Sequence, residues 1–405
     1  MTNPATSGKI AIGTSRYRKA NLALFWAGFI TFVTLYDIQP LLPLFTREFN
    51  ISPAVGSLPL SISTATLAVG MLFAGFSSDS IGRKPLMAVA LLLTSLLAMA
   101  TSFVEQLPHL LALRFLQGAA LAGVPSVAMA YLGDEMDTDA IASAMGLYIS
   151  GNAVGGMCGR VVTAVIADHL PWRVTIGSIG IVCLLLTAAF IYLLPPQQQF
   201  QRRSFQLSTL IPTYLRHLRD PGMLCLFGVA FFSMGGFISL YNYIGFRLLD
   251  APYLFSQSAI SLIFLVYFLG SFSSAMIGRL MLRFGRRPVI LLTIVSMAAG
   301  IMLTLPTPAP SIICGVALFT CGFFGIHSIA SGLVSKRALV NRAQATSLYL
   351  FSYYLGSSIS GTVGGLFWSR FGWTGVAIMI GLLLAGVLAC TELLGRRYGE
   401  APLVG

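Results

Sequence analysis

Three ionisable residues, Asp37, Arg114 and Arg160, interrupt long apolar stretches of the chain. If those stretches cross a membrane, each charge costs about 2.5–3.5 kcal/mol at the bilayer centre and requires a partner or a water-lined cavity. A helix rise of 1.5 Å per residue predicts that all three lie about 6–10 Å below the outer edge of the membrane core. Asp37 and Arg114 can therefore form an ion pair, with Gln117 as a relay.

The chemistry that such a pair supports is the uptake and release of protons. Desolvation destabilises a buried carboxylate and a neighbouring cation stabilises it, so its pKa shifts in either direction when solvent access changes. We therefore predict that Asp37 is a proton carrier; the alternative is that Asp37 and Arg114 form a fixed structural pair. Arg160 either competes for Asp37 or extends outward to the lipid headgroups.

Other polar and aromatic residues within the apolar stretches are candidates for a substrate cavity. His327 is either a proton or substrate group or a satisfied packing residue. Tyr353 lies in an aromatic stretch for which ordinary packing is an equal alternative. The full set of candidate cavity residues is Asn152, Arg160, Tyr241, Asn242, His327 and Tyr353.

The composition determines which kind of element positions these residues. Of the 405 residues, 56% are hydrophobic and 9% are charged, whereas about 25% are charged in an ordinary globular domain. This excludes a soluble enzyme, a disordered tail and a secreted disulfide scaffold, and it indicates a polytopic membrane protein. The net charge of +12 is spread over short polar connections, so no nucleic-acid partner is expected. The six cysteines form no CxxC pair, so no metal site is expected.

Twelve stretches are long and apolar enough to span a bilayer as helices. The first is too long for a cleavable signal peptide. With the N-terminus inside, 19 of the 25 Lys and Arg residues fall on the cytoplasmic side, which predicts that both termini are cytoplasmic. The predicted spans are 21–43, 54–78, 85–104, 108–132, 140–167, 172–194, 222–249, 257–281, 288–306, 309–335, 343–369 and 373–394.

The second half of the chain repeats the first. TFVTLYD at 31–37 matches GFISLYN at 236–242, and three further segments match in the same order at offsets of 201–203 residues. Such a repeat predicts two six-helix units of the same orientation, related by an axis along the membrane normal. Because Asp37 matches the neutral Asn242, we expect the first half to handle protons and the second to contact substrate. The predicted domains are an N-terminal half 1–194, a cytoplasmic linker 195–221 and a C-terminal half 222–405.

Four motifs resemble those of the major facilitator superfamily, in its twelve-span drug:proton antiporter type. Asp37-x-x-Pro40-x-x-Pro43 and Arg114-x-x-Gln117-Gly118 resemble motifs of the first and fourth spans. The glycine series at 151–159 resembles the antiporter motif of the fifth span, with Gly156 where a proline is usual.

The fourth motif, the block 75–85, resembles the signature loop of the superfamily. The resemblance implies a latch at the cytoplasmic ends of the two halves, formed by Gly75, Asp79, Gly82, Arg83 and Lys84. The second copy of this loop has Leu282 where the first has Asp79. The resemblance also implies an all-α integral membrane fold of twelve helices, in which the first and fourth spans face a central cavity.

These observations favour a proton-coupled efflux antiporter that moves small amphipathic molecules across a bacterial inner membrane by alternating access. It is expected to act as a monomer, without a cofactor, and with the proton gradient as its energy source. The alternatives are a proton-linked sugar or metabolite transporter, working as exporter or importer, and a membrane sensor without transport. A membrane enzyme is not expected, because the apolar blocks hold no paired carboxylates, no HExxH motif and no Ser–His–Asp set at matching depth. A pump driven by ATP is not expected, because the chain has no GxxxxGK[ST] loop.

Overall fold

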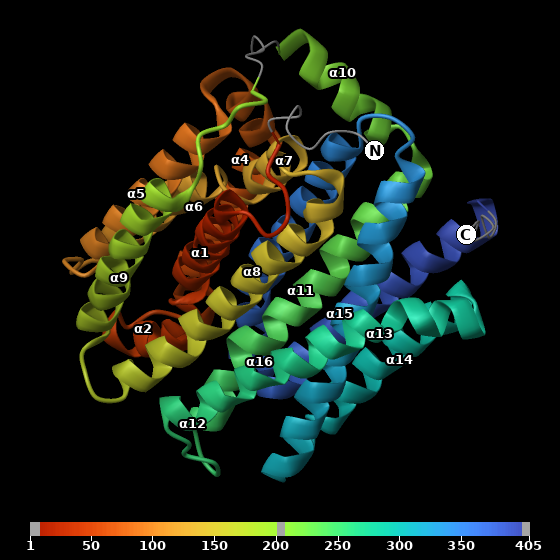
Figure 1. Ribbon diagram of the computed structural model, residues 1–405. Helices are drawn as coiled ribbons and strands as arrows, with labels where there is room; N and C mark the ends of the chain where they lie inside the picture. Colours follow the sequence, from red (N-terminus) through yellow and green to blue (C-terminus); the bar gives the residue numbers. More distant parts are fainter. Residues whose placement is uncertain (1–8, 201–206, 399–405) are drawn as a thin grey trace. The chain divides into compact units, whose positions relative to one another are not determined.

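The computed structural model describes residues 9–200 and 207–398, which are almost entirely helical (Figure 1). The chain ends 1–8 and 399–405 lie outside the described residues. So do residues 201–206 of the predicted linker, including Arg202 and Arg203 of the charge count. Within the described ranges, eleven helical stretches are long and apolar enough to cross a membrane, and the longest of them, Arg342–Arg396, contains two spans.

Those two spans are joined at Gly372, where the backbone turns sharply at φ 58° and ψ −145°. A positive φ of this kind is readily adopted by glycine and rarely by other residues. The bend divides the stretch into two membrane-spanning helices, so the described chain has twelve spans in total. The predicted all-helical fold with twelve spans is confirmed.

The first compact unit contains residues up to Leu41 and the segment Val69–Gln206. Its helices bury one face in a shared apolar core and leave large apolar side chains on the outside, such as Phe115, which is 53% exposed. That pattern suits helices whose outer face meets lipid. The elements are α1 (Ser15–Tyr36), η1 (Gln39–Leu41), the second part of α4 (Leu58–Ile81), α5 (Arg83–Thr101), α6 (Leu107–Leu121), α7 (Pro125–Glu135), α8 (Thr138–Ala167) and α9 (Trp172–Leu193).

The second compact unit contains Leu42–Ala68 and the chain from Leu207 onward. The segment Leu42–Ala68 therefore packs with this unit, although it falls within the predicted N-terminal half; the boundaries at residues 194 and 222 stay predictions. The elements are α2 (Leu42–Glu48), α3 (Pro53–Gly56), the first part of α4, α10 (Leu207–Leu218), α11 (Pro221–Leu249), α12 (Gln257–Ser261), η2 (Leu262–Val266), α13 (Tyr267–Phe284), α14 (Arg286–Leu303), α15 (Ala309–Arg337) and α16 (Arg342–Tyr398).

Each unit contains one very close helix pair, α1 with α8 and α11 with α16 (Figure 1). In the first pair, a Cβ atom added at Gly155 would collide with the backbone of Phe29. In the second pair, a Cβ atom added at Gly356 would collide with the backbone of Phe231. Small residues allow helix backbones to approach this closely inside a membrane. The glycines therefore allow the close approach of the two helices in each pair.

The first span is interrupted. Helix α1 ends at Tyr36, and the chain continues through η1 and α2 to Glu48. Pro40 causes the break, because proline has no N–H group to donate and disfavours helical geometry in the residue before it. The interruption leaves the last carbonyl groups of α1 without partners inside the helix, at the position of Asp37.

Candidate functional site

The end of α1 is capped by a side chain from another helix. Arg114 on α6 donates hydrogen bonds to the carbonyl oxygens of Thr34 and Leu35, at 3.0 and 2.9 Å. These carbonyls belong to the last turn of α1, where a cation is favoured by the helix dipole. The guanidinium of Arg114 is therefore held in place by the backbone independently of any carboxylate.

Arg114 also connects the polar side chains that the sequence analysis grouped together. Its Nη1 lies 3.4 Å from Oδ1 of Asp37 and 2.6 Å from Oε1 of Gln117. The amide nitrogen of Gln117 donates to the carbonyl oxygen of Thr94 at 3.3 Å. The side chains of Asp37, Arg114 and Gln117 are at most 2% exposed. The structure thus brings these three residues together, with Gln117 anchoring Arg114 to α5.

The carboxylate of Asp37 is only half engaged. Oδ1 faces Arg114, whereas Oδ2 is buried and has no hydrogen-bond partner among the described residues. A buried carboxylate oxygen without a partner is costly as an anion. Oδ2 of Asp37 can therefore accept a proton, which would make the carboxyl group neutral.

Arg160 on α8 forms a second buried cationic group close to the break in the first span. Its Nε donates to Oε1 of Gln39 at 2.5 Å, and its Nη1 donates to the carbonyl oxygen of Gly156 at 2.7 Å. Its guanidinium carbon lies 3.8 Å from the ring centroid of Tyr36, a cation–π arrangement. Because Arg160 is only 2% exposed, the expectation that it extends outward to the headgroups is wrong. Tyr36 and Gln39 were missed, although they lie beside Asp37 in the same motif.

Asn152, also on α8, lies against α1 further along the same helix pair. A Cβ atom added at Gly28 would collide with Oδ1 of Asn152, so this glycine makes room for the amide. Asn152 is partly buried, and its Oδ1 has no hydrogen-bond partner among the described residues. Asn152 thus lies in the contact between α1 and α8, and its predicted role in a substrate cavity stays a prediction.

In the second unit, three of the predicted cavity residues belong to one aromatic cluster. Tyr241 packs on Phe237 at 4.9 Å between ring centroids, and Phe237 stacks on Phe323 at 3.9 Å. Phe323 in turn stacks on His327 at 6.0 Å, and His327 lies 4.9 Å from Tyr353. The cluster joins α11, α15 and the first half of α16. We name these five residues the aromatic cluster.

The polar tips of the aromatic cluster have partners of their own. The hydroxyl of Tyr241 lies 2.7 Å from the hydroxyl of Thr320, and Nδ1 of His327 lies 2.9 Å from the hydroxyl of Tyr349. Asn242 is 2% exposed, and its amide nitrogen faces Gly361, where an added Cβ would lie 3.1 Å away. Asn242 therefore lies on the α16 side of α11, away from the hydroxyl of Tyr241.

The signature loop between α4 and α5 is organised around Arg83. Its Nη2 lies 2.6 Å from Oδ2 of Asp134 and 3.3 Å from Oδ1 of Asp79, and its Nη1 donates to the hydroxyl of Ser78 at 3.1 Å. Asp134 was not among the predicted latch residues. The available signal was the acidic segment 134–139, which begins in the last turn of α7. It contains no basic residue, although the charge count predicts that it lies on the cytoplasmic side.

The remaining latch residues differ in how strongly the structure requires them. Gly82 has a φ of +108°, which favours glycine, and an added Cβ would lie 2.8 Å from the amide nitrogen of Gln197. Gln197 accepts a hydrogen bond from the backbone N–H of Arg83 at 2.8 Å, and Lys84 donates to the carbonyl oxygen of Leu194. Gly75, by contrast, faces open space, since no heavy atom lies within 4 Å of an added Cβ.

Comparisons with known proteins agree with this architecture. Residues 24–273 and 248–402 match the sequence profile of the Major Facilitator Superfamily. The uncharacterized MFS-type transporter YybF of Bacillus subtilis (strain 168) is 46% identical over 384 residues, covering 95% of this chain and 95% of YybF. The inner membrane transport protein YnfM of Escherichia coli (strain K12) is 44% identical over 385 residues, covering 95% of this chain and 92% of YnfM.

Among solved structures, a bacterial homologue of the human lysosomal transporter Spinster, in an inward-facing and unoccupied conformation, superposes with a TM-score of 0.74. It is 15% identical and covers 94% of this chain and 97% of that one, so the likeness concerns the fold. The profile match and the two close relatives together show that the chain belongs to the Major Facilitator Superfamily of membrane transporters.

Proposed function

We propose that this chain is a proton-coupled secondary transporter that exports small amphipathic molecules in exchange for protons, by alternating access. It would work in a bacterial inner membrane as a monomer, with both termini in the cytoplasm and with no cofactor other than the proton gradient. The observation that carries the proposal is the buried carboxylate of Asp37, which has one oxygen on Arg114 and one oxygen without a partner.

The proton would be carried on Oδ2 of Asp37. Arg114 is held by two carbonyl oxygens and by Gln117, so its guanidinium keeps its place when the carboxyl group becomes neutral. Protonation would therefore loosen Asp37 rather than Arg114, and the break in the first span gives this part of the chain freedom to move. Each proton that enters through 100 mV releases about 2.3 kcal/mol, which can drive export of the substrate.

The aromatic cluster supports the proposed substrate class. Stacked rings with a few hydroxyl groups offer apolar surface and occasional hydrogen bonds, which suits molecules that are themselves largely apolar. The direction of transport rests on the resemblance of residues 151–159 to the antiporter motif. The conformational role of Asp79, Arg83 and Lys84 rests on the resemblance of the signature loop and is supported by the charge network around Arg83.

The test is transport into and out of proteoliposomes with an imposed pH gradient, using a panel of dyes, antibiotics, sugars and amino acids. We expect wild-type protein to move at least one amphipathic compound against its gradient and Asp37→Asn to lose this coupling. Asp250→Asn is the matched control, because Asp250 is an aspartate paired with an arginine, Arg47, on an exposed surface.

A second measurement separates coupling from binding. Substrate exchange without a pH gradient should persist in Asp37→Asn, because exchange needs the substrate site and the conformational change but no net proton movement. If Asp37→Asn transports as steeply with the gradient as the wild type, Asp37 is not the coupling residue. Movement of sugars or amino acids alone would favour the metabolite transporter, and movement of no compound at all would favour a sensor.

A further inference from the structure

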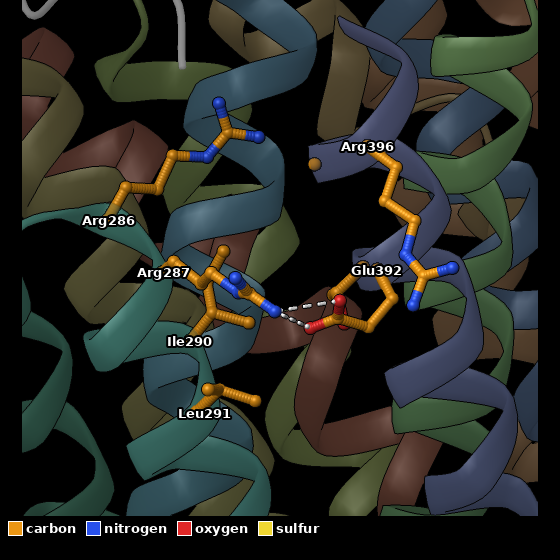
Figure 2. A pocket seen from close by; sticks show the side chains of 8 residues that line it. Arg286, Arg287, Ile290, Leu291, Glu392 and Arg396 are labelled. Carbon is orange, nitrogen blue, oxygen red and sulfur yellow. Dashed lines mark hydrogen bonds and ion pairs between the residues drawn. The ribbon is translucent and has the colours of Figure 1, made fainter. Parts of the chain in front are cut away.

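A hollow of about 280 Å³ lies in the second unit, where the start of α14 meets the end of α16 (Figure 2). It is separate from the aromatic cluster, and the mechanism proposed above makes no use of it. Its lining is mainly charged and apolar. The lining consists of Arg286, Arg287, Ile290, Leu291, Thr391, Glu392, Gly395 and Arg396.

The charge of this hollow favours an anion. Arg287 donates to both carboxylate oxygens of Glu392, at 3.2 and 3.0 Å, and Figure 2 shows this pair bridging the two helices. The lining holds three arginines and one glutamate, so its net formal charge is +2. Guanidinium groups are well suited to bind phosphate oxygens, which they can contact in a bidentate manner.

The helix that supplies Arg286 and Arg287 adds to this field. Both residues lie in the first turn of α14, an 18-residue helix whose N-cap residue, Gly285, has no side chain with which to cap it. The N-terminus of a helix carries a partial positive charge and unpaired N–H groups, and both favour a negatively charged ligand. The helix dipole and the arginines of the lining therefore all favour a negatively charged ligand.

The apolar part of the lining indicates which anion fits. Ile290 and Leu291 continue the wall one turn beyond the arginines. Further along the outer face of α14, Leu292 and Val295 are 55% and 61% exposed, and Leu393 on α16 is 48% exposed. Those surfaces suit contact with acyl chains, and they begin directly beside the cationic lining.

We propose that this hollow binds the phosphate headgroup of an anionic phospholipid, with the acyl chains along the outer faces of α14 and α16. Arg286 and Arg396 hold the phosphate. Glu392 limits the attraction by occupying Arg287. The site lies at the end of the helices that the charge count predicts to be cytoplasmic, the side on which basic residues commonly meet anionic lipids.

The experiment is native mass spectrometry of the full-length protein in detergent, titrated with phosphatidylglycerol and separately with phosphatidylcholine. We expect phosphatidylglycerol to bind more tightly. The double variant Arg286→Gln/Arg396→Gln should weaken its binding about 25-fold, from about fivefold for each arginine. The matched control Arg279→Gln/Arg283→Gln, which removes two arginines of α13 outside the hollow, should change binding by less than about threefold.

A gain-of-binding variant protects the test against misfolding. Glu392→Gln releases Arg287 and raises the net charge of the lining by one, so it should strengthen phosphatidylglycerol binding about fivefold. Equal binding of phosphatidylcholine, an equal loss in the α13 control, or unchanged binding in Glu392→Gln would each overturn the proposal. Displacement of the lipid by inorganic phosphate at similar concentrations would also overturn it, because the ligand would then be a soluble phosphate.

Discussion

The two compact units each contain a close, glycine-lined helix pair, but they differ in the chemistry of their buried side chains. The first buries a carboxylate and two guanidinium groups around the break in its first span, whereas the second presents the aromatic cluster. At the repeat spacings of 202 and 201 residues, Arg114 corresponds to Val316 and Arg160 to Gly361. Asp37 corresponds to Asn242. We name Asp37, Arg114 and Arg160 the charged cluster; each of its three buried charges has a neutral counterpart in the second unit.

This difference shows which features the scaffold requires. Gly155 and Gly356 occupy equivalent positions and bring their helices equally close, so close packing of small residues is common to both units. Buried charges are costly in a membrane, and the described residues of the second unit contain no counterpart of the Asp37, Arg114 and Arg160 charges. The charged cluster is therefore not needed to build a six-helix unit, which favours a functional role for it.

The largest effect is expected from removing the cation of the charged cluster. Arg114→Met would leave the carboxylate of Asp37 buried without its partner and the carbonyls of Thr34 and Leu35 uncapped. We expect a loss of about 3–5 kcal/mol in the free energy of unfolding, measured by thermal or denaturant unfolding in detergent. Asn242→Leu, at the neutral counterpart of Asp37, should cost only about 1 kcal/mol. Equal losses in the two variants would remove the contrast between the units.

The shared helix packing should respond alike in both units. Gly155→Ala and Gly356→Ala each place a methyl group against a facing backbone, so each should destabilise the protein by about 1–3 kcal/mol. Gly75→Ala is the control, because open space surrounds an added Cβ there; its melting temperature should not fall, since alanine favours the helix more than glycine does. A large effect in only one of the two units would show that the units do not share their packing.

The charge network around Arg83, which includes Asp79 and Asp134, should be needed in the first unit alone, because the second copy of the signature loop has Leu282 in place of Asp79. Asp134→Asn weakens the shortest contact of Arg83, and we expect the transport rate in proteoliposomes to fall about tenfold, as for the loss of a charge-assisted hydrogen bond. Leu282→Asp restores the missing acid in the second copy, at a side chain that is 79% exposed. That variant should change transport by less than about twofold, because exposed ion pairs contribute little. A gain in transport would mean that the second copy also serves as a latch.

The smallest effect is a dependence on pH in the second unit, outside the membrane spans. Partial burial of Asp220 acts to raise its pKa, but hydrogen bonds from Arg337 and from the backbone of Gly222 outweigh it and hold the pKa below its ordinary value. A lowered pKa in the folded state stabilises the protein above about pH 4, the pKa of an unfolded aspartate, and this contribution is lost as the pH falls through the folded value.

Thermal unfolding measured between about pH 6 and pH 3 should therefore show a decline in stability that is smaller in Asp220→Asn than in the wild type. The difference should be at most about 1 kcal/mol, since the side chains of Asp220 and Arg337 are about 30% exposed. Identical profiles for the two proteins would show that this pair does not contribute to the pH dependence.

The sequence predicted which residues would carry charge inside the membrane, but only part of their contacts. Asp37 and Arg114 were predicted to lie at a similar depth in the membrane, because the rise per residue of a helix and the thickness of the bilayer are known. The structure shows the two side chains 3.4 Å apart. Arg160 was expected to bind Asp37 or to reach the headgroups, whereas its described hydrogen bonds go to Gln39 and to Gly156. The choice between acceptors a few ångströms apart depends on helix rotation, which hydropathy does not report.

The twelve spans, the duplication and the location of the costly charges can be read from the amino-acid sequence, because the bilayer sets the length of each apolar helix and tolerates few polar residues within it. The contacts of Asp134 with Arg83, 51 residues away, and of Glu392 with Arg287, 105 residues away, became visible in the three-dimensional structure. Those partners come from helices far apart in the chain, and their meeting depends on how glycines and bulky side chains fit together. Such packing depends on how the side chains of distant helices fit together in space, so it cannot be read from a local sequence pattern.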